Sequence, residues 1–69
     1  MPYAGEIRIG AVYQSATLPS SRRVTRIMHG CVDYILYERG RRSVRPSCSL
    51  TEEMFRQFTS HEIPPEQIQ

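Results

Sequence analysis

Arginine is the residue type in this chain that is best suited to chemistry with a partner. All nine basic residues are arginine and none is lysine. A guanidinium group is planar, keeps its charge, and presents a fork of donors that matches phosphate and carboxylate groups. Codon usage in a GC-rich genome also produces an arginine excess, so the sequence leaves both origins open.

The arginines fall into two groups that are separated along the chain. The first group lies at residues 22–26, and the second surrounds a glycine in the stretch YERGRRSVRP at residues 37–46. We predict that the binding residues are Arg22, Arg23, Arg26, Tyr37, Arg39, Arg41, Arg42 and Arg45. Arginines that neutralise phosphate beside a stacking aromatic ring are typical of small β-modules that bind nucleic acid. The alternative is a solvated hairpin tip, whose charges keep sheet edges from pairing.

Protein contact is a further interpretation of the same residue types. Tyrosine and arginine are the residues most enriched at interface hot spots. The chain has four tyrosines beside its arginines, namely Tyr3, Tyr13, Tyr34 and Tyr37. Such a surface suits an acidic partner, and an exposed edge strand can also pair with a second copy of the chain, so a homodimer stays open.

No catalytic pattern is present in the sequence. Asp33 and Glu38 are the only acidic residues between Glu6 and Glu52, and no two carboxylates have a spacing that predicts paired acid–base chemistry. Neither a Gly-x-Ser-x-Gly elbow nor a glycine-rich phosphate loop occurs. We therefore predict a protein that is not an enzyme and has no cofactor.

The soft metal-ligand types do not have the spacing of a metal site. His29, Cys31, Cys48 and His61 offer four possible ligands. The closely spaced cysteine pairs of zinc sites are missing, however. We interpret both cysteines as small apolar groups and predict no metal.

Size and composition limit the class of protein. The chain has 69 residues, enough for a single domain over 1–69, and nine basic against seven acidic residues give a net charge of +2. That balance alone does not argue for nucleic acid. No apolar stretch approaches the roughly 18 residues of a membrane helix, and the start MPYAGEIRIG lacks a signal-peptide core. We expect a cytoplasmic protein with reduced thiols and no membrane partner.

Four segments have the pattern of β-strands, at about 6–14, 22–29, 31–39 and 42–46. In the first segment Ile7, Ile9, Ala11 and Tyr13 share one side, and Gly10 indicates a bulge or bend. Gly30 predicts a turn before the third segment. That segment has apolar residues on both faces, with Val32, Tyr34 and Leu36 together on one of them, which predicts a central strand.

The period changes after residue 48, and we predict a helix at about 50–61. Ser49 and Glu52 have the spacing of a capping box. Apolar residues recur at helical spacing, namely Leu50, Met54, Phe55 and Phe58. The helix must end before Pro64, and residues 64–69 are expected to form a loose tail.

These elements predict an α+β fold. The sheet is a small antiparallel one or an SH3-like, partly open barrel of three or four strands, followed by one C-terminal helix that covers it. In such a meander the start of the second strand lies near the end of the third. The two arginine groups are therefore expected to converge at one end of the sheet.

The order of motifs also carries a resemblance. The motifs are Gly10-Ala11-Val12-Tyr13, Arg22-Arg23-Val24, Gly30-Cys31-Val32-Asp33-Tyr34, and Ser49-Leu50 followed by Phe55. Over residues 6–58 this order resembles that of short uncharacterised prophage and plasmid proteins, whose pattern implies an SH3-like barrel ending in a helix. Small accessory proteins of this kind include regulators and inhibitors of host machinery, among them inhibitors of CRISPR defence.

We therefore expect a non-catalytic accessory protein of a phage or mobile element. Its expected partner is a host protein or nucleoprotein complex in the cytoplasm of a bacterial cell, which it binds through tyrosine and arginine. Inhibition of host machinery is one role that the resemblance implies. The alternative is a nucleic-acid-binding module that uses the arginine-rich hairpin end.

Overall fold

The chain is built mainly of β-strands. A computed structural model describes residues 2–17, 19–38, 41–42 and 48–67, with the backbone alone for 41–42. Within these residues the elements are β1 (Val12–Ser15), β2 (Ser20–Met28), β3 (Cys31–Glu38), β4 (Arg41–Arg42), β5 (Cys48–Thr51), α1 (Glu52–Gln57), β6 (Thr59–Ile63) and a 3-10 turn, η1 (Pro65–Gln67). The part of the fourth predicted strand at 43–46 lies outside the described residues.

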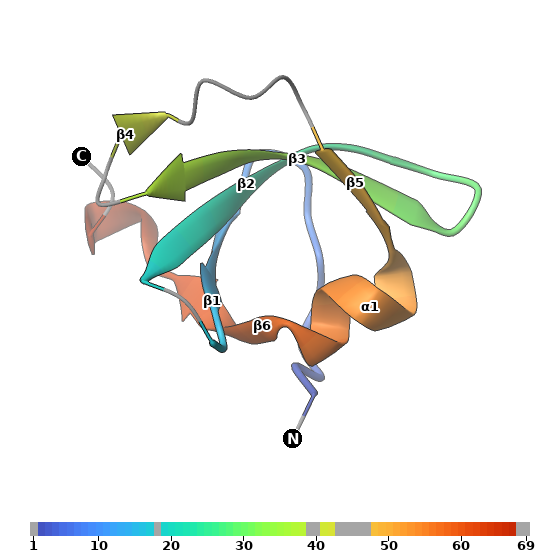
Figure 1. Ribbon diagram of the computed structural model, residues 1–69, viewed down its shortest axis with the longest axis horizontal. Helices are drawn as coiled ribbons and strands as arrows, with labels where there is room; N and C mark the ends of the chain where they lie inside the picture. The colour runs from blue at the N-terminus through green and yellow to red at the C-terminus, as the bar shows by residue number, and fades with distance from the viewer. Residues whose placement is uncertain (1, 18, 39–40, 43–47, 68–69) are drawn as a thin grey trace.

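The strands form an antiparallel sheet with the order β4-β3-β2-β1-β6. The short strand β4 pairs with the end of β3, and β5 pairs with its first half. Figure 1 shows the sheet curving, with α1 on the side where β5 and β6 approach each other. The α+β prediction and the central place of the third strand are thus confirmed. The predicted number of three or four strands is wrong, because β5 and β6 also join the sheet. The predicted terminal position of the helix is wrong as well, because β6 follows α1 and pairs with β1.

The hairpin between β2 and β3 is closed by a two-residue turn. His29 and Gly30 both have positive φ, 52° and 74°, which is the type I′ geometry that matches strand twist. The turn predicted at Gly30 is therefore confirmed. The N–H of Glu52 donates to the carbonyl of Gly30 at 2.9 Å, so the tip of the hairpin is tied to the start of α1.

The first strand is shorter than predicted, and its expected face is broken by a turn. Gly10 has a φ of 89°, and Ile9 and Gly10 form a turn that ends before β1 begins. The predicted bend is confirmed. Ile9 is consequently 65% exposed, whereas Tyr13 is fully buried, so these two residues do not share a face as the alternation predicted.

The helix is shorter than predicted and has a different cap. Thr51 is its N-cap, and its hydroxyl accepts the N–H of Met54 at 3.2 Å. Ser49 instead belongs to β5, where it is paired with Asp33 of β3, so the predicted Ser49–Glu52 capping box is wrong. The ladder with β3 keeps Ser49 and Leu50 extended, and the chain turns into the helix only where that ladder ends.

The end of α1 leads directly into the last strand. The N–H of Phe58 donates to Met54, and the buried hydroxyl of Thr59 donates to the carbonyl of Phe55 at 2.6 Å. These bonds satisfy the helix end and turn the chain into β6. Residues 65–67 then form one 3-10 turn, so the prediction of a loose tail is wrong there.

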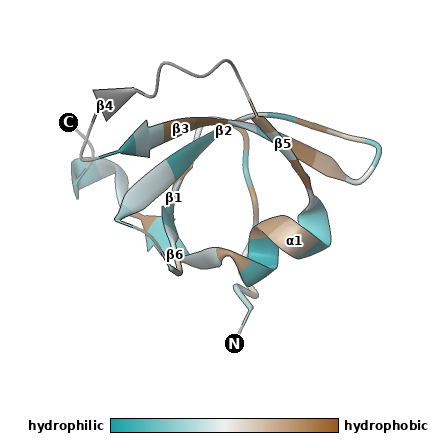
Figure 2. Ribbon diagram, in the orientation of Figure 1, coloured by the Kyte–Doolittle hydropathy of each residue, from teal (hydrophilic) through white to brown (hydrophobic). Residues whose placement is uncertain are grey.

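The core is a small aromatic cluster between the sheet and the helix. Its buried members are Tyr13, Val24, Val32, Tyr34 and Phe55. The ring of Phe55 lies 5.5 Å from that of Tyr13 and 5.9 Å from that of Tyr34, both at inclined angles that aromatic pairs favour. Figure 2 shows hydrophobic residues along β3 and β5 and on α1. The predicted cover by the helix thus depends on Phe55, since Met54 is exposed.

Candidate binding surface

Neighbouring arginines in β2 lie on opposite faces of the sheet, because strand side chains alternate. Arg22 points inward and is only 7% exposed. Its Nη1 donates to the carbonyl of Phe58 at 3.1 Å, and its guanidinium lies 5.5 Å from the ring centre of Tyr34. The structure therefore places Arg22 in the interior, where it links β2 to the end of α1, and not on the predicted surface.

Arg23 lies on the outer face, where it is half-buried. It is paired across the strands with Val12 on one side and Ile35 on the other. Its guanidinium lies 5.9 Å from the ring centre of Tyr37. The Nε atom is buried and has no hydrogen-bond partner among the described residues, and Arg23 forms no ion pair with them.

The second arginine group approaches Tyr37 through β4. The backbones of Arg41 and Arg42 pair with Glu38 and Tyr37 in β3. Tyr37 is in turn paired with Ser21, two residues before Arg23 in β2. The sheet thus brings Arg23, Tyr37 and the backbone of β4 together at one end. Arg39 and Arg45, which were predicted to join them, lie outside the described residues.

Arg26 belongs to a different part of the sheet. It is paired with Asp33, beyond an irregularity in the β2–β3 ladder, toward the hairpin turn. It is exposed, and its Nη2 donates to the sulfur of Met28 at 2.9 Å. The structure therefore separates Arg26 from the pair formed by Arg23 and Tyr37.

The four tyrosines divide between core and surface. Tyr13 and Tyr34 are core residues, and Tyr3 packs edge-on against Tyr13 at 5.6 Å. The hydroxyl of Tyr13 accepts the N–H of Arg8 at 2.8 Å and donates to a backbone carbonyl, and burial raises its pKa. Tyr37 is the tyrosine on the outer face beside an arginine, so the idea of a four-tyrosine binding surface does not fit the structure.

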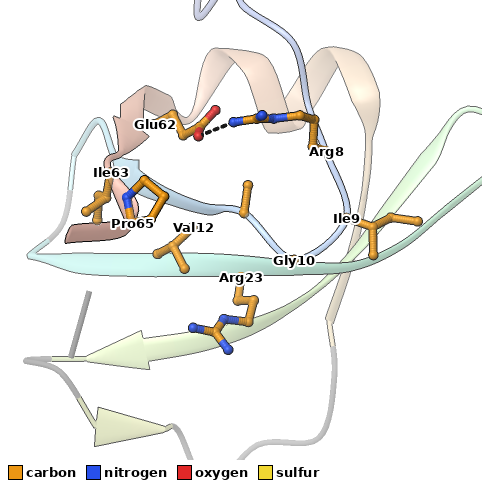
Figure 3. Close-up of a pocket in the computed structure, with 9 residues that line it drawn as sticks. Arg8, Ile9, Gly10, Val12, Arg23, Glu62, Ile63 and Pro65 are labelled. Carbon is orange, nitrogen blue, oxygen red and sulfur yellow. Dashed lines mark hydrogen bonds and ion pairs between the residues drawn. The ribbon is translucent and has the colours of Figure 1, made fainter. Parts of the chain in front are cut away.

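A groove of about 450 Å³ opens on the outer face next to Arg23. It is lined by Arg8, Ile9, Gly10, Ala11, Val12, Arg23, Glu62, Ile63 and Pro65. Figure 3 shows Val12, Ile63 and Pro65 gathered at one end and Ile9 at the other. Sequence reasoning missed this groove because its lining comes from three separate segments, one of which was predicted to be helix and tail.

An ion pair closes one rim of the groove. A guanidinium nitrogen of Arg8 donates to the carboxylate of Glu62, and this bond and charge raise the pKa of Arg8. The positive charge of Arg8 is therefore matched within the groove. The guanidinium of Arg23, on the opposite rim, has no such carboxylate in the described part of the chain.

The structure offers no second kind of site among the residues that it describes. Cys31 and Cys48 form no disulfide, and no group of three histidine, cysteine or acidic side chains is placed to hold a metal. None of the described helices is long and apolar enough to cross a membrane. Comparison of the chain with protein-family models, curated proteins and solved structures gives no match.

Proposed function

We propose that this protein is a non-catalytic binding module that holds a partner protein through the outer face around Arg23 and Tyr37. The observation that carries the proposal is the state of Arg23. Its side chain is half-buried, its guanidinium lies over the ring of Tyr37, and it forms no ion pair with the described residues.

The position of Arg23 favours binding for a physical reason. A half-buried guanidinium has already lost part of its hydration, and the ring of Tyr37 restricts its motion. A partner carboxylate then gains a charge-assisted hydrogen bond at a lower cost in ordering the side chain. Arginine and tyrosine in this arrangement are frequent hot spots of protein interfaces.

The fold supports the accessory-protein part of the proposal in a general way. Neighbouring strands follow the order β6-β1-β2-β3-β5, and along the chain the short helix α1 lies between β5 and β6. This arrangement fits an SH3-like partly open barrel. Together with the motif order, this supports a small accessory protein of a phage or mobile element. We propose that its partner is a host protein or nucleoprotein, and that binding inhibits host machinery, of which CRISPR defence is one example.

Nucleic-acid binding is the second candidate, and β4 is the observation in its favour. The backbone of this strand pairs Arg42 with Tyr37 and Arg41 with Glu38. Arginine near a stacking ring is typical of modules that bind single-stranded nucleic acid. The two candidates differ in their dependence on salt. Affinity for nucleic acid falls steeply as salt rises, in proportion to the phosphates that are neutralised, whereas a compact protein interface responds much less.

Capture of partners from the host cell tests the proposal. The tagged full chain is used with and without nuclease, alongside the variants Arg23→Gln and Arg26→Gln, which remove the same charge from one strand. We expect a protein partner that survives nuclease treatment, is lost with Arg23→Gln and is kept with Arg26→Gln. Loss of every partner after nuclease favours the second candidate, and equal binding by both variants shows that the Arg23 face is not the binding surface.

A further inference from the structure

We infer that the groove beside Arg23 receives an extended peptide segment of the partner, in which an acidic residue is close to an apolar one. This inference rests on the proposed function and adds the chemistry of the partner. The groove and the Arg23–Tyr37 pair lie on one face, since Arg23 is paired with Val12 at the floor of the groove.

The apolar part of the groove is suited to an apolar side chain of the ligand. Val12 is 5% exposed and forms the floor, while Ile63 is half-buried beside it. At the far end Ile9 is 65% exposed, held out by the turn at Gly10. A branched or aromatic side chain laid between these residues removes apolar surface from water on both partners, which favours association.

The charges of the groove are complementary to a ligand with one carboxylate. The charge of Arg8 is matched by Glu62, so that rim is close to neutral. Arg23 on the other rim forms no ion pair with the described residues, so its charge is unmatched there. A single acidic side chain complements this arrangement, because it pairs with Arg23 and stays away from Glu62.

The same charges make a phosphate backbone a poorer occupant. A nucleic-acid strand carries a negative phosphate charge at every nucleotide. Some of those charges would lie over the apolar floor or near Glu62. A peptide can instead place its one charge where Arg23 is. The groove therefore favours protein over nucleic acid as the ligand.

The volume of the groove fits an extended segment of a partner peptide. A volume of about 450 Å³ lies within the range that holds a small ligand or a few side chains. Alternate side chains of an extended chain point to one side and are about 7 Å apart. An acidic and an apolar residue with one residue between them can therefore reach both Arg23 and the floor at Val12.

Selection from a displayed library of random short peptides, with the full-length protein as bait, tests this inference. We expect the selected peptides to share an Asp or Glu near a Leu, Ile, Val or Phe. Binding of a labelled selected peptide is then measured by fluorescence anisotropy. Ile9→Ser and Arg23→Gln are expected to weaken it about tenfold each, and the matched controls Met54→Ser and Arg26→Gln to change it less than about twofold.

The outcomes separate the inference from the proposed function. Selection of basic or uncharged peptides, or equal binding by the groove variants and their controls, overturns the inference. Ile9 is 65% exposed and is not a member of the core cluster, so a loss of binding by Ile9→Ser is not explained by unfolding; circular dichroism verifies this. In the capture experiment, release of the host partner by Ile9→Ser supports the inference. Release by Arg23→Gln alone overturns the inference and leaves the proposed function, and release by neither overturns both.

Discussion

Replacing Arg22 with methionine asks whether a buried guanidinium stabilises this small domain. Arg22 is 7% exposed and has no carboxylate within reach in the described residues. Its contacts are the hydrogen bond to the carbonyl of Phe58 and the ring of Tyr34. Its Nε is buried without a hydrogen-bond partner there. Methionine has a similar length and keeps the apolar packing while it removes the charge.

The opposing contributions are close in size. A hydrogen bond from a charged donor contributes about 1.5–3 kcal/mol, and the contact with the ring about 0.5–2 kcal/mol. Burial of an ion costs several kcal/mol, and this cost disappears in the variant. The carbonyl of Phe58 also keeps the N–H of Ala16, at 2.8 Å, so it is not left without a donor. We therefore expect Arg22→Met to have a free energy of unfolding within about 1 kcal/mol of the wild type.

Urea denaturation followed by circular dichroism measures this difference, with Arg22→Ala as the comparison. The alanine variant loses the packing of the long side chain as well, so it is expected to be less stable than the methionine variant by about 1–3 kcal/mol. A shift of about 1 kcal/mol corresponds to a change in Tm of about 4–8 °C in a domain of this size. A loss of about 3 kcal/mol or more in Arg22→Met would refute the reasoning, because the charge itself would then hold β2 to the end of α1.

Four further substitutions test the core, the helix cap and the buried phenol. Phe55→Ala removes a fully buried ring that contacts two tyrosines and is expected to cost about 3–5 kcal/mol, so circular dichroism should show a largely unfolded chain; a cooperative transition close to that of the wild type would contradict this. Thr51→Ala is expected to cost about 1 kcal/mol and Ser49→Ala less than about 0.5 kcal/mol, and the reverse order in urea denaturation would favour the capping box predicted from the sequence. Burial raises the pKa of Tyr13 above 10.0, so the native state keeps this proton after the unfolded state has lost it. The free energy of unfolding therefore has its full Tyr13 contribution below about pH 10 and loses it as pH rises through the folded pKa. Tyr13→Phe should lower Tm at neutral pH, since two hydrogen bonds are lost, yet reduce the alkaline fall of Tm; an unchanged fall would contradict the assignment.

The parts of the fold that the sequence predicts well are those set by local chemistry. The turn at Gly30 needs residues that accept positive φ, and the apolar residues of β3 on both faces indicate a central strand. The end of the chain was harder to predict. The spacing of apolar residues from Leu50 to Phe58 is helical, but pairing with β3 takes the first part of that segment into the sheet.

The last strand could not be predicted from its own residues. Residues 59–63 are mostly polar and give no apolar alternation. They form β6 because β1 offers them an edge and because Thr59 is buried at the end of α1. Such a strand depends on tertiary contacts, and a sequence pattern does not contain them.

The candidate surface was predictable in part. Strand alternation alone separates Arg22 from Arg23. The register of β2 with β3, which the structure supplies, is what places Arg23 on the same face as Tyr37. The groove is different, since residues 8–12, Arg23 in β2 and residues 62–65 at the end of β6 meet only in the folded chain. No spacing in the sequence relates these three segments.

Net charge is a poor guide to what this chain binds, because its arginines have different surroundings. Arg8 and Arg56 are matched by carboxylates, and Arg22 is buried among core groups. Arg26 is exposed, so it is hydrated, and a partner that displaces this water gains little. Arg23 is half-buried over an aromatic ring and has no ion-pair partner in the described residues, so part of its water is already lost before a partner arrives. Under the proposed function, the same formal charge is therefore expected to contribute most to binding at Arg23, the one of these five positions where folding has already removed part of the water.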